Sequence, residues 1–233
     1  MIVNYFFCFG KSYGCFLLCE QFVNIIIMLG LEIIIFIIIF LFSVVLHELA
    51  HGYVAFSLGD DTAKMAGRLT LNPIKHLDLV GSIIVPGALI LLSSLGMGGI
   101  IFGWAKPVPY NPYKLKDPKY GSAKVAIAGP LANFSLAVIF GLSLRFIPVI
   151  YTIPGMLMVF LYIVQINLIL GLFNLIPIPP LDGSKILFTF IKSQKLKMVF
   201  ARYGFMIFFL VIYSFLPLLS KLVVWLTSAI IGS

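Results

Sequence analysis

Long apolar runs separated by short polar stretches dominate the sequence. The strongest run lies at residues 31–58, and others follow at about 80–103, 125–147, 155–176 and 203–231. A helix needs about 20 apolar residues to cross the hydrocarbon core of a bilayer. The pattern therefore predicts an all-α integral membrane protein, a polytopic helical bundle of about 4–6 membrane segments.

Basic residues predict how these segments are oriented. Lys and Arg gather in residues 59–79, 104–124 and 177–202, whereas the connection 147–154 carries no charge. Cytoplasmic loops of membrane proteins are enriched in Lys and Arg. We therefore expect the three basic stretches to face the cytoplasm, and the compact form of the chain favours a bacterial plasma membrane.

The run at 80–103 has basic stretches on both sides, so it should enter and leave the membrane on one face. It contains Pro86 and several glycines, which weaken a helix. We expect a re-entrant or partly extended element that dips into the membrane, with an ordinary span as the alternative. The last run contains Pro217 and Lys221, and it fits one kinked helix or a span plus an interfacial segment.

Three parts of the chain can be distinguished. Residues 1–30 form an apolar extension or an extra span, and a natural start at Met28 is the alternative. Residues 31–205 form the membrane core that carries the candidate chemistry, and residues 206–233 form one or more C-terminal membrane segments.

Composition narrows the class of protein. Apolar residues make up 61% of the 233 residues and charged residues only 10%, against about 25% charged in soluble domains. This excludes a soluble enzyme and a disordered protein. The net charge of +8 comes from short clusters between apolar runs, so we expect the lipid bilayer, and no nucleic acid, as a partner.

The polar residues most typical of a site are His47, Glu48 and His51, which lie inside the first apolar run. Positions i and i+4 share one helix face, so the two histidines can bind one metal ion. Zinc favours two imidazoles, a third protein ligand and an open position for water, whose proton a nearby carboxylate can take. A metal-free cluster of His and Glu is the alternative.

A third ligand is needed, and Asp182 is the favoured candidate. It follows Pro177, Pro179 and Pro180 at the end of an apolar run, where the prolines break the helix. His76 and Asp78 form a competing pair in a polar loop, where packing within the loop is the simpler interpretation.

With these motifs the chain resembles the site-2 protease family of intramembrane zinc metalloproteases, in the short form without a PDZ or CBS domain. The resemblance covers about residues 31–205 and depends on five segments: HELAH (47–51), LNPIKHLDLVGS (71–82), GWAKPVPYNP (103–112), AGPLANF (128–134) and NLIPIPPLDGSKIL (174–187).

The resemblance implies that His47, His51 and Asp182 bind one Zn²⁺ per chain and that Glu48 is the catalytic acid and base. It also implies that Asn174 faces the active site, where it could stabilise the oxyanion, with Asn133 as a weaker candidate. The expected function is a zinc metalloendopeptidase that hydrolyses peptide bonds in or near transmembrane segments of membrane-protein substrates, as in regulated intramembrane proteolysis. The alternatives are a zinc-binding membrane transporter and a non-catalytic membrane scaffold, and the sequence says nothing of the oligomeric state.

Overall fold

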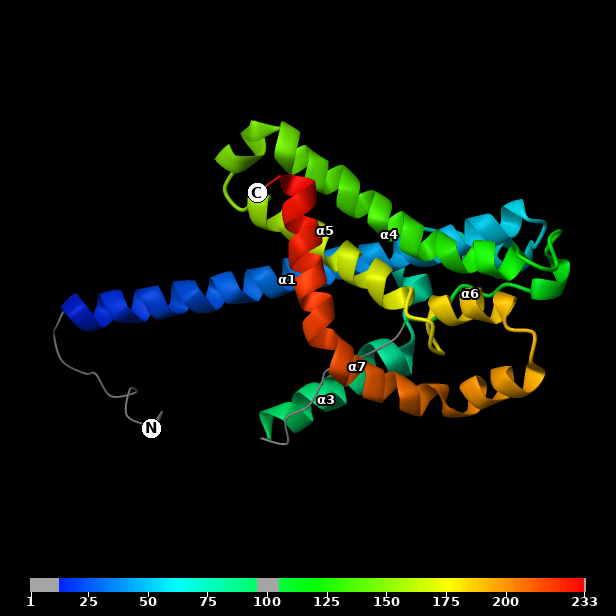
Figure 1. Ribbon diagram of the computed structural model, residues 1–233. Helices are drawn as coiled ribbons and strands as arrows, with labels where there is room; N and C mark the ends of the chain where they lie inside the picture. Colours follow the sequence, from blue (N-terminus) through cyan, green and yellow to red (C-terminus); the bar gives the residue numbers. More distant parts are fainter. Residues whose placement is uncertain (1–12, 96–104, 233) are drawn as a thin grey trace. The chain divides into compact units, whose positions relative to one another are not determined.

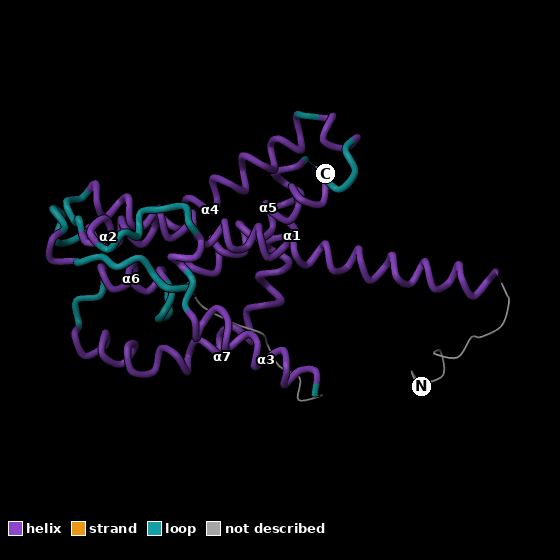
Figure 2. Tube along the Cα trace, turned by 180° about the vertical axis from the view of Figure 1, so that it is seen from behind, coloured by secondary structure: helices purple, strands orange, loops and turns teal. Residues whose placement is uncertain are grey.

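The computed structural model describes residues 13–95 and 105–232 (Figure 1). Every regular element within these ranges is helical and none is a strand (Figure 2), which confirms the all-α prediction. The elements are α1 (Tyr13–Ser57), α2 (Thr62–Met65), η1 (Pro73–His76), η2 (Leu79–Ile84), α3 (Val85–Ser94), η3 (Pro112–Lys114), α4 (Gly121–Phe146), η4 (Pro148–Thr152), α5 (Met156–Asn174), α6 (Asp182–Phe190) and α7 (Gln194–Ile231).

The chain divides into two compact units, residues 1–38 and 39–233. The described part of the first unit is the beginning of α1. Among its described side chains, Ile33, Ile34 and Ile38 are exposed. An uninterrupted apolar helix of this kind satisfies its own backbone hydrogen bonds and can present such a surface to lipid.

Four helical segments of the described chain are long and apolar enough to cross a membrane: Gly30–Ser57, Gly121–Phe146, Met156–Asn174 and Ser214–Ile231. The protein is therefore a polytopic integral membrane protein. The last run is one continuous helix, α7, with Pro217 inside it. Within α7, the segment Ser214–Ile231 qualifies as a span.

The segment expected to dip into the membrane is helical where the structure describes it, because η2 runs directly into α3. The apolar stretch Leu79–Ser94 reaches at most about 24 Å at 1.5 Å per residue, short of the ~30 Å hydrocarbon core. The remaining part of the segment, residues 96–104, lies outside the described residues, so the re-entrant path stays a prediction.

The core of the second unit lies where α4, α5 and α7 pack together (Figure 1). Ala137, Val164, Leu168, Leu219 and Val223 form its buried centre. Small residues allow the helices to approach closely. At Gly171, a Cβ atom would lie 2.8 Å from the ring of Phe134, so α5 can meet α4 there only because the side chain is absent.

The connections between α1 and α4 hold an irregular segment, residues 105–111, beside the end of α1. Pro107 and Pro109 favour extended backbone in the residues before them, so we call it the extended segment. The anchor is Asp60, which is fully buried and accepts hydrogen bonds from the backbone N–H of Asn111 and from Thr62. Burial by itself raises the pKa of Asp60, but these hydrogen bonds more than offset it and hold the pKa below its usual range. The segment is therefore fixed at its C-terminal end by a charged carboxylate.

Candidate metal centre

The candidate centre is built from the C-terminal turns of α1 and the first residue of α6. His47 and His51 lie one helical turn apart on α1 and are 5% and 7% exposed. Asp182 begins α6 and is 6% exposed. Buried polar groups of this kind require partners, because an unpaired one is costly in an apolar surrounding.

The loop before α6 brings Asp182 to the histidines. Pro177, Pro179 and Pro180 prevent α5 from continuing, and the chain turns back before α6 begins. Gly183 makes this path possible, since a Cβ atom there would lie 2.2 Å from the carbonyl oxygen of Leu175. The Asp-Gly pair therefore combines a ligand with the close backbone approach that places it.

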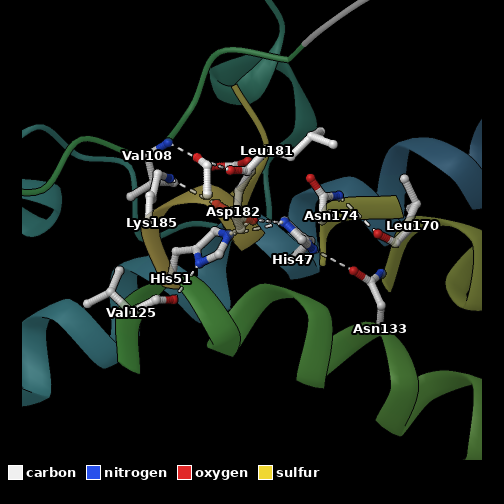
Figure 3. A network of polar contacts seen from close by, with 12 residues as sticks. His47, His51, Val108, Val125, Asn133, Leu170, Asn174, Leu181, Asp182 and Lys185 are labelled. Carbon is white, nitrogen blue, oxygen red and sulfur yellow. Dashed lines mark hydrogen bonds and ion pairs between the residues drawn. The ribbon is translucent and has the colours of Figure 1, made fainter. Parts of the chain in front are cut away.

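Three candidate ligand atoms meet at this point (Figure 3). The Nε2 atoms of His47 and His51 are 3.0 Å apart. One carboxylate oxygen of Asp182, Oδ2, lies 3.1 Å from Nε2 of His47 and 3.0 Å from Nε2 of His51. Three residues separated by up to 135 positions in the sequence thus present one atom each to a common point.

The hydrogen bonds of the two Nδ1 atoms determine whether the Nε2 atoms carry a proton or a lone pair. Nδ1 of His51 lies 2.7 Å from the carbonyl oxygen of Val125, which can only accept a hydrogen bond. Nδ1 of His47 lies 2.5 Å from Oδ1 of Asn133, which also only accepts. A neutral imidazole has one proton, so both protons reside on Nδ1 and both Nε2 atoms carry a lone pair.

The three atoms are therefore all acceptors, with no proton between them when the histidines are neutral. Such a group repels itself unless a cation joins it, which is the chemistry of a metal site. Ligand atoms around a tetrahedral zinc ion with bonds of about 2.0–2.1 Å lie roughly 3.3 Å apart. The observed spacing of 3.0–3.1 Å fits that geometry closely.

Helix α4 covers the centre at Gly129. A Cβ atom there would lie 2.5 Å from Nε2 of His51 and 2.6 Å from Nε2 of His47. No side chain can therefore be accommodated where α4 passes the ligand atoms. The missing side chain is what lets α4 pass this close to the three acceptors.

Glu48 lies next to these ligands and is half-buried. One of its carboxylate oxygens and one ring nitrogen each of His47 and His51 all lie within 4.8 Å of one another. Its Oε2 accepts a hydrogen bond of 2.8 Å from the backbone N–H of Val108, in the extended segment. Glu48 is thus held by a group outside α1 and remains close enough to exchange a proton with a water at the centre.

Lys185 contacts the oxygen of Asp182 that does not face the histidines. Its Nζ lies 2.9 Å from Oδ1 of Asp182. Burial by itself lowers the pKa of Lys185, but the negative charge of Asp182 more than offsets it and holds the pKa above its usual range. The ammonium group therefore stays charged and occupies Oδ1, so that Oδ2 is the oxygen available to a metal.

The other candidates from the sequence, Asn174, His76 and Asp78, form hydrogen bonds within their own helix or loop. Asn174, at the end of α5, donates one of its two amide N–H groups to the carbonyl oxygen of Leu170 in its own helix (Figure 3). Asp78 caps η2, and His76 is buried with Nε2 bonded to the carbonyl oxygen of Thr70. The competing pair therefore has structural partners within its own loop.

Sequence reasoning did not single out Ser43, Asn167, Gly129 or Lys185. Asn167 is a polar residue inside an apolar run, which is a usable signal. Gly129 lies within the quoted segment AGPLANF and Lys185 within LDGSKIL. Their contacts with the centre depend on helix packing, so nothing in their spacing along the chain indicates them.

Comparison with known proteins places this geometry in a family. A family model described as peptidase family M50 matches residues 35–153 and 150–214. "Putative zinc metalloprotease YwhC" of Bacillus subtilis (strain 168) is 42% identical over 192 residues, which cover 78% of this chain and 80% of that protein.

More distant relatives are longer than the matched region. "Zinc metalloprotease MJ0392" of Methanocaldococcus jannaschii is 29% identical over 74% of this chain and 43% of its own length. "Putative zinc metalloprotease Rip2" of Mycolicibacterium smegmatis is 32% identical over 61% of this chain and 52% of its own length. No solved structure matches. Because the family model spans most of the chain, this protein belongs to peptidase family M50, the site-2 protease family, and is a zinc-dependent metalloprotease.

Proposed function

We propose that this metalloprotease is an intramembrane endopeptidase that holds one zinc ion per chain through His47, His51 and Asp182. One observation carries the proposal: three acceptor atoms converge at 3.0–3.1 Å with both imidazole protons committed elsewhere. All three ligands are at most 7% exposed. The site faces the cytoplasmic side of a bacterial plasma membrane, a proposal supported by the basic loops around it.

In the proposed mechanism Glu48 is the acid and base. Zinc held by the three ligands would polarise the scissile carbonyl and make the attacking water more acidic. Glu48 takes the proton from that water and later gives it to the leaving amine. The N–H of Val108 holds the carboxylate in place between the two transfers.

We assign Asn174 to the oxyanion of the tetrahedral intermediate. Its bond to Leu170 uses one amide N–H, and the amide has a second one to donate. A donor of this kind contributes on the order of 3 kcal/mol to catalysis.

The substrates are membrane proteins with a transmembrane helix. Both histidines lie inside an apolar helix, α1, that is long enough to span the membrane. A substrate helix hides its amides in internal hydrogen bonds, so it must unwind locally before the carbonyl can reach the centre. Cleavage is therefore expected in or near the transmembrane segment.

The test compares wild type, Glu48→Gln and Glu32→Gln, purified in detergent with zinc content measured, on a single-pass membrane reporter. Glu48→Gln leaves the three ligands intact and removes the base. Activity should therefore fall about 10³-fold at equal zinc, within the usual range of about 10²–10⁴ for a general acid or base. Glu32 lies in the first unit and serves as the matched glutamate control. Asn174→Ala should keep zinc and lose about 10²–10³-fold in kcat.

Two outcomes contradict the proposal. Full cleavage by Glu48→Gln at equal zinc would remove Glu48 from the mechanism. Wild type that holds zinc but leaves several reporters whole would favour zinc transport or a scaffold role, and zinc flux into vesicles would separate these two.

A further inference from the structure

A chain of buried polar side chains connects the candidate centre to α5. Asn133 on α4 and Asn167 on α5 are fully buried, and Ser43 on α1 is 3% exposed. Three spans thus each contribute one polar residue to the apolar interior. Polar groups inside a bundle are costly unless they are paired, and every amide here has a partner.

The contact between Asn167 and Ile163 determines the direction of every hydrogen bond in this series of side chains. The side-chain amide of Asn167 lies 2.8 Å from the carbonyl oxygen of Ile163, which can only accept, so the atom facing it is the donor Nδ2. Oδ1 of Asn167 therefore points the other way, at 2.7 Å from Asn133. Because that oxygen only accepts, Asn133 must turn its Nδ2 towards it.

Asn133 in turn orients His47 at the candidate metal centre. With Nδ2 of Asn133 committed to Asn167, its Oδ1 faces Nδ1 of His47 at 2.5 Å. An acceptor at this place requires the imidazole proton on Nδ1 and leaves the lone pair on Nε2. A backbone carbonyl of α5 thereby determines the tautomer of a histidine on α1.

We propose that Asn167 and Asn133 are positioning residues that hold His47 in the Nδ1–H tautomer, so that metal affinity depends on α5. The proposal deepens the metal centre proposed above and adds a residue, Asn167, that touches no ligand. Partners in the outer shell of a metal site typically change metal affinity or activity by about 10–100-fold. His51 has its own acceptor, the carbonyl of Val125, and is independent of this chain of contacts.

The first experiment reads the tautomers directly in the metal-free protein. The chain has only three histidines, so ¹⁵N-histidine labelling gives three imidazoles. Spectra are recorded at increasing pH until the ring shifts stop changing, so that the neutral forms are compared. His47 and His51 should be Nδ1–H forms. His76, whose Nε2 bonds to the carbonyl of Thr70, should be the opposite form and serves as the internal reference, assigned by its loss in His76→Gln.

The second experiment compares Asn167→Leu with Ser43→Ala. Asn167→Leu frees Asn133 to turn, so His47 should lose its single tautomer and zinc affinity should fall by about 10-fold or more. Ser43→Ala removes one hydrogen bond from Asn167 but keeps the Ile163 bond that sets the direction. It should leave the tautomer unchanged and zinc affinity within about two-fold, as measured by competition with a chelating dye.

A wild-type spectrum with His47 in the Nε2–H form would overturn the proposal without any variant, even if Asn167→Leu failed to fold. A folded Asn167→Leu protein with unchanged tautomer and zinc affinity would also overturn it. Neither readout uses peptide cleavage, so an inactive protein with the expected tautomers would contradict the endopeptidase and leave the positioning role intact.

Discussion

The absent side chain at Gly129 matters as much to the centre as the ligands that are present. Helix α4 passes the Nε2 atoms of His47 and His51 at a distance where a Cβ atom would be 2.5–2.6 Å away. The neighbouring atoms are ring nitrogens held at their other side by Asn133 and Val125. They cannot retreat without losing those hydrogen bonds.

Gly129→Ala is therefore expected to lower zinc affinity by on the order of 100-fold, the upper end of what outer-shell changes produce. Gly141→Ala is the matched control, because it lies on the same helix but its Cβ would meet the side chain of Ile230. It should lower thermal stability and leave zinc affinity unchanged. Equal zinc affinity in both variants would show that α4 does not limit the space at the centre.

Among the residues of the centre, the proposed ligands could be predicted from the sequence, whereas their hydrogen-bond partners could not. The spacing of His47 and His51 on one helix determines that they share a face. The proton positions depend on Val125 and Asn133, which lie 74 and 86 positions away. No local pattern encodes contacts between separate helices.

Among the elements, α1, α4 and α5 are joined by the buried side chains of Ser43, Asn133 and Asn167. Hydrogen bonds between helices in membranes stabilise by only about 0.6 kcal/mol on average. The contacts of Asn133 and Asn167 therefore contribute little to holding α1, α4 and α5 together. Their geometry at His47 is the better reason for two fully buried amides.

The extended segment 105–111 places one backbone donor on the proposed base. Val108 donates to Glu48 at 2.8 Å, and a hydrogen bond to a charged group contributes about 1.5–3 kcal/mol. The following residue, Pro109, already biases Val108 towards extended backbone. Proline at position 108 should therefore be tolerated by the backbone while removing the N–H.

Val108→Pro is expected to lower kcat by about 10-fold or more at unchanged zinc content, since the Glu48 carboxylate loses its donor. Val108→Ala keeps the N–H and loses only part of a buried side chain, so it should retain most of the activity. Reporter cleavage with zinc quantified in each sample measures the difference. If the two variants lose activity equally, packing of the side chain explains the effect and the donor does not.

For the whole molecule, the basic loops and the four candidate spans predict one orientation in the membrane. Tyr113 lies in the basic connection before α4 and is 98% exposed. Tyr151 lies in the uncharged connection after α4 and is 52% exposed. If α4 crosses the bilayer, these positions lie on opposite sides, with Tyr113 in the cytoplasm.

Cysteine labelling tests this orientation after Cys8, Cys15 and Cys19 are changed to serine. Tyr151→Cys should react with a membrane-impermeant maleimide in intact cells, and Tyr113→Cys only after permeabilisation. The reverse pattern would place the candidate centre at the outer face. Reaction of both on one side would mean that α4 does not cross.

The sequence by itself determined the class of protein, the spans and the candidate ligands. These follow from local quantities: the free energy of transferring an apolar run into lipid, the bias of Lys and Arg between loops and the helical spacing of His47 and His51. The path of residues 80–103 could be predicted only in part. Its described part is helical, and no local feature of an apolar helix distinguishes a segment that dips into the membrane from one that spans it.

Tertiary structure alone decided which atoms meet. The donor for Glu48 lies 60 positions away, the acceptor for His47 lies 86 away, and Asp182 lies 135 away. Close approaches at Gly129, Gly171 and Gly183, where a Cβ atom would lie 2.2–2.8 Å from a neighbour, let the helices and loops around the centre pack this tightly. A hydrogen bond is short and directional, so its partners are set by the packing of α1, α4, α5 and α6, which no single segment specifies.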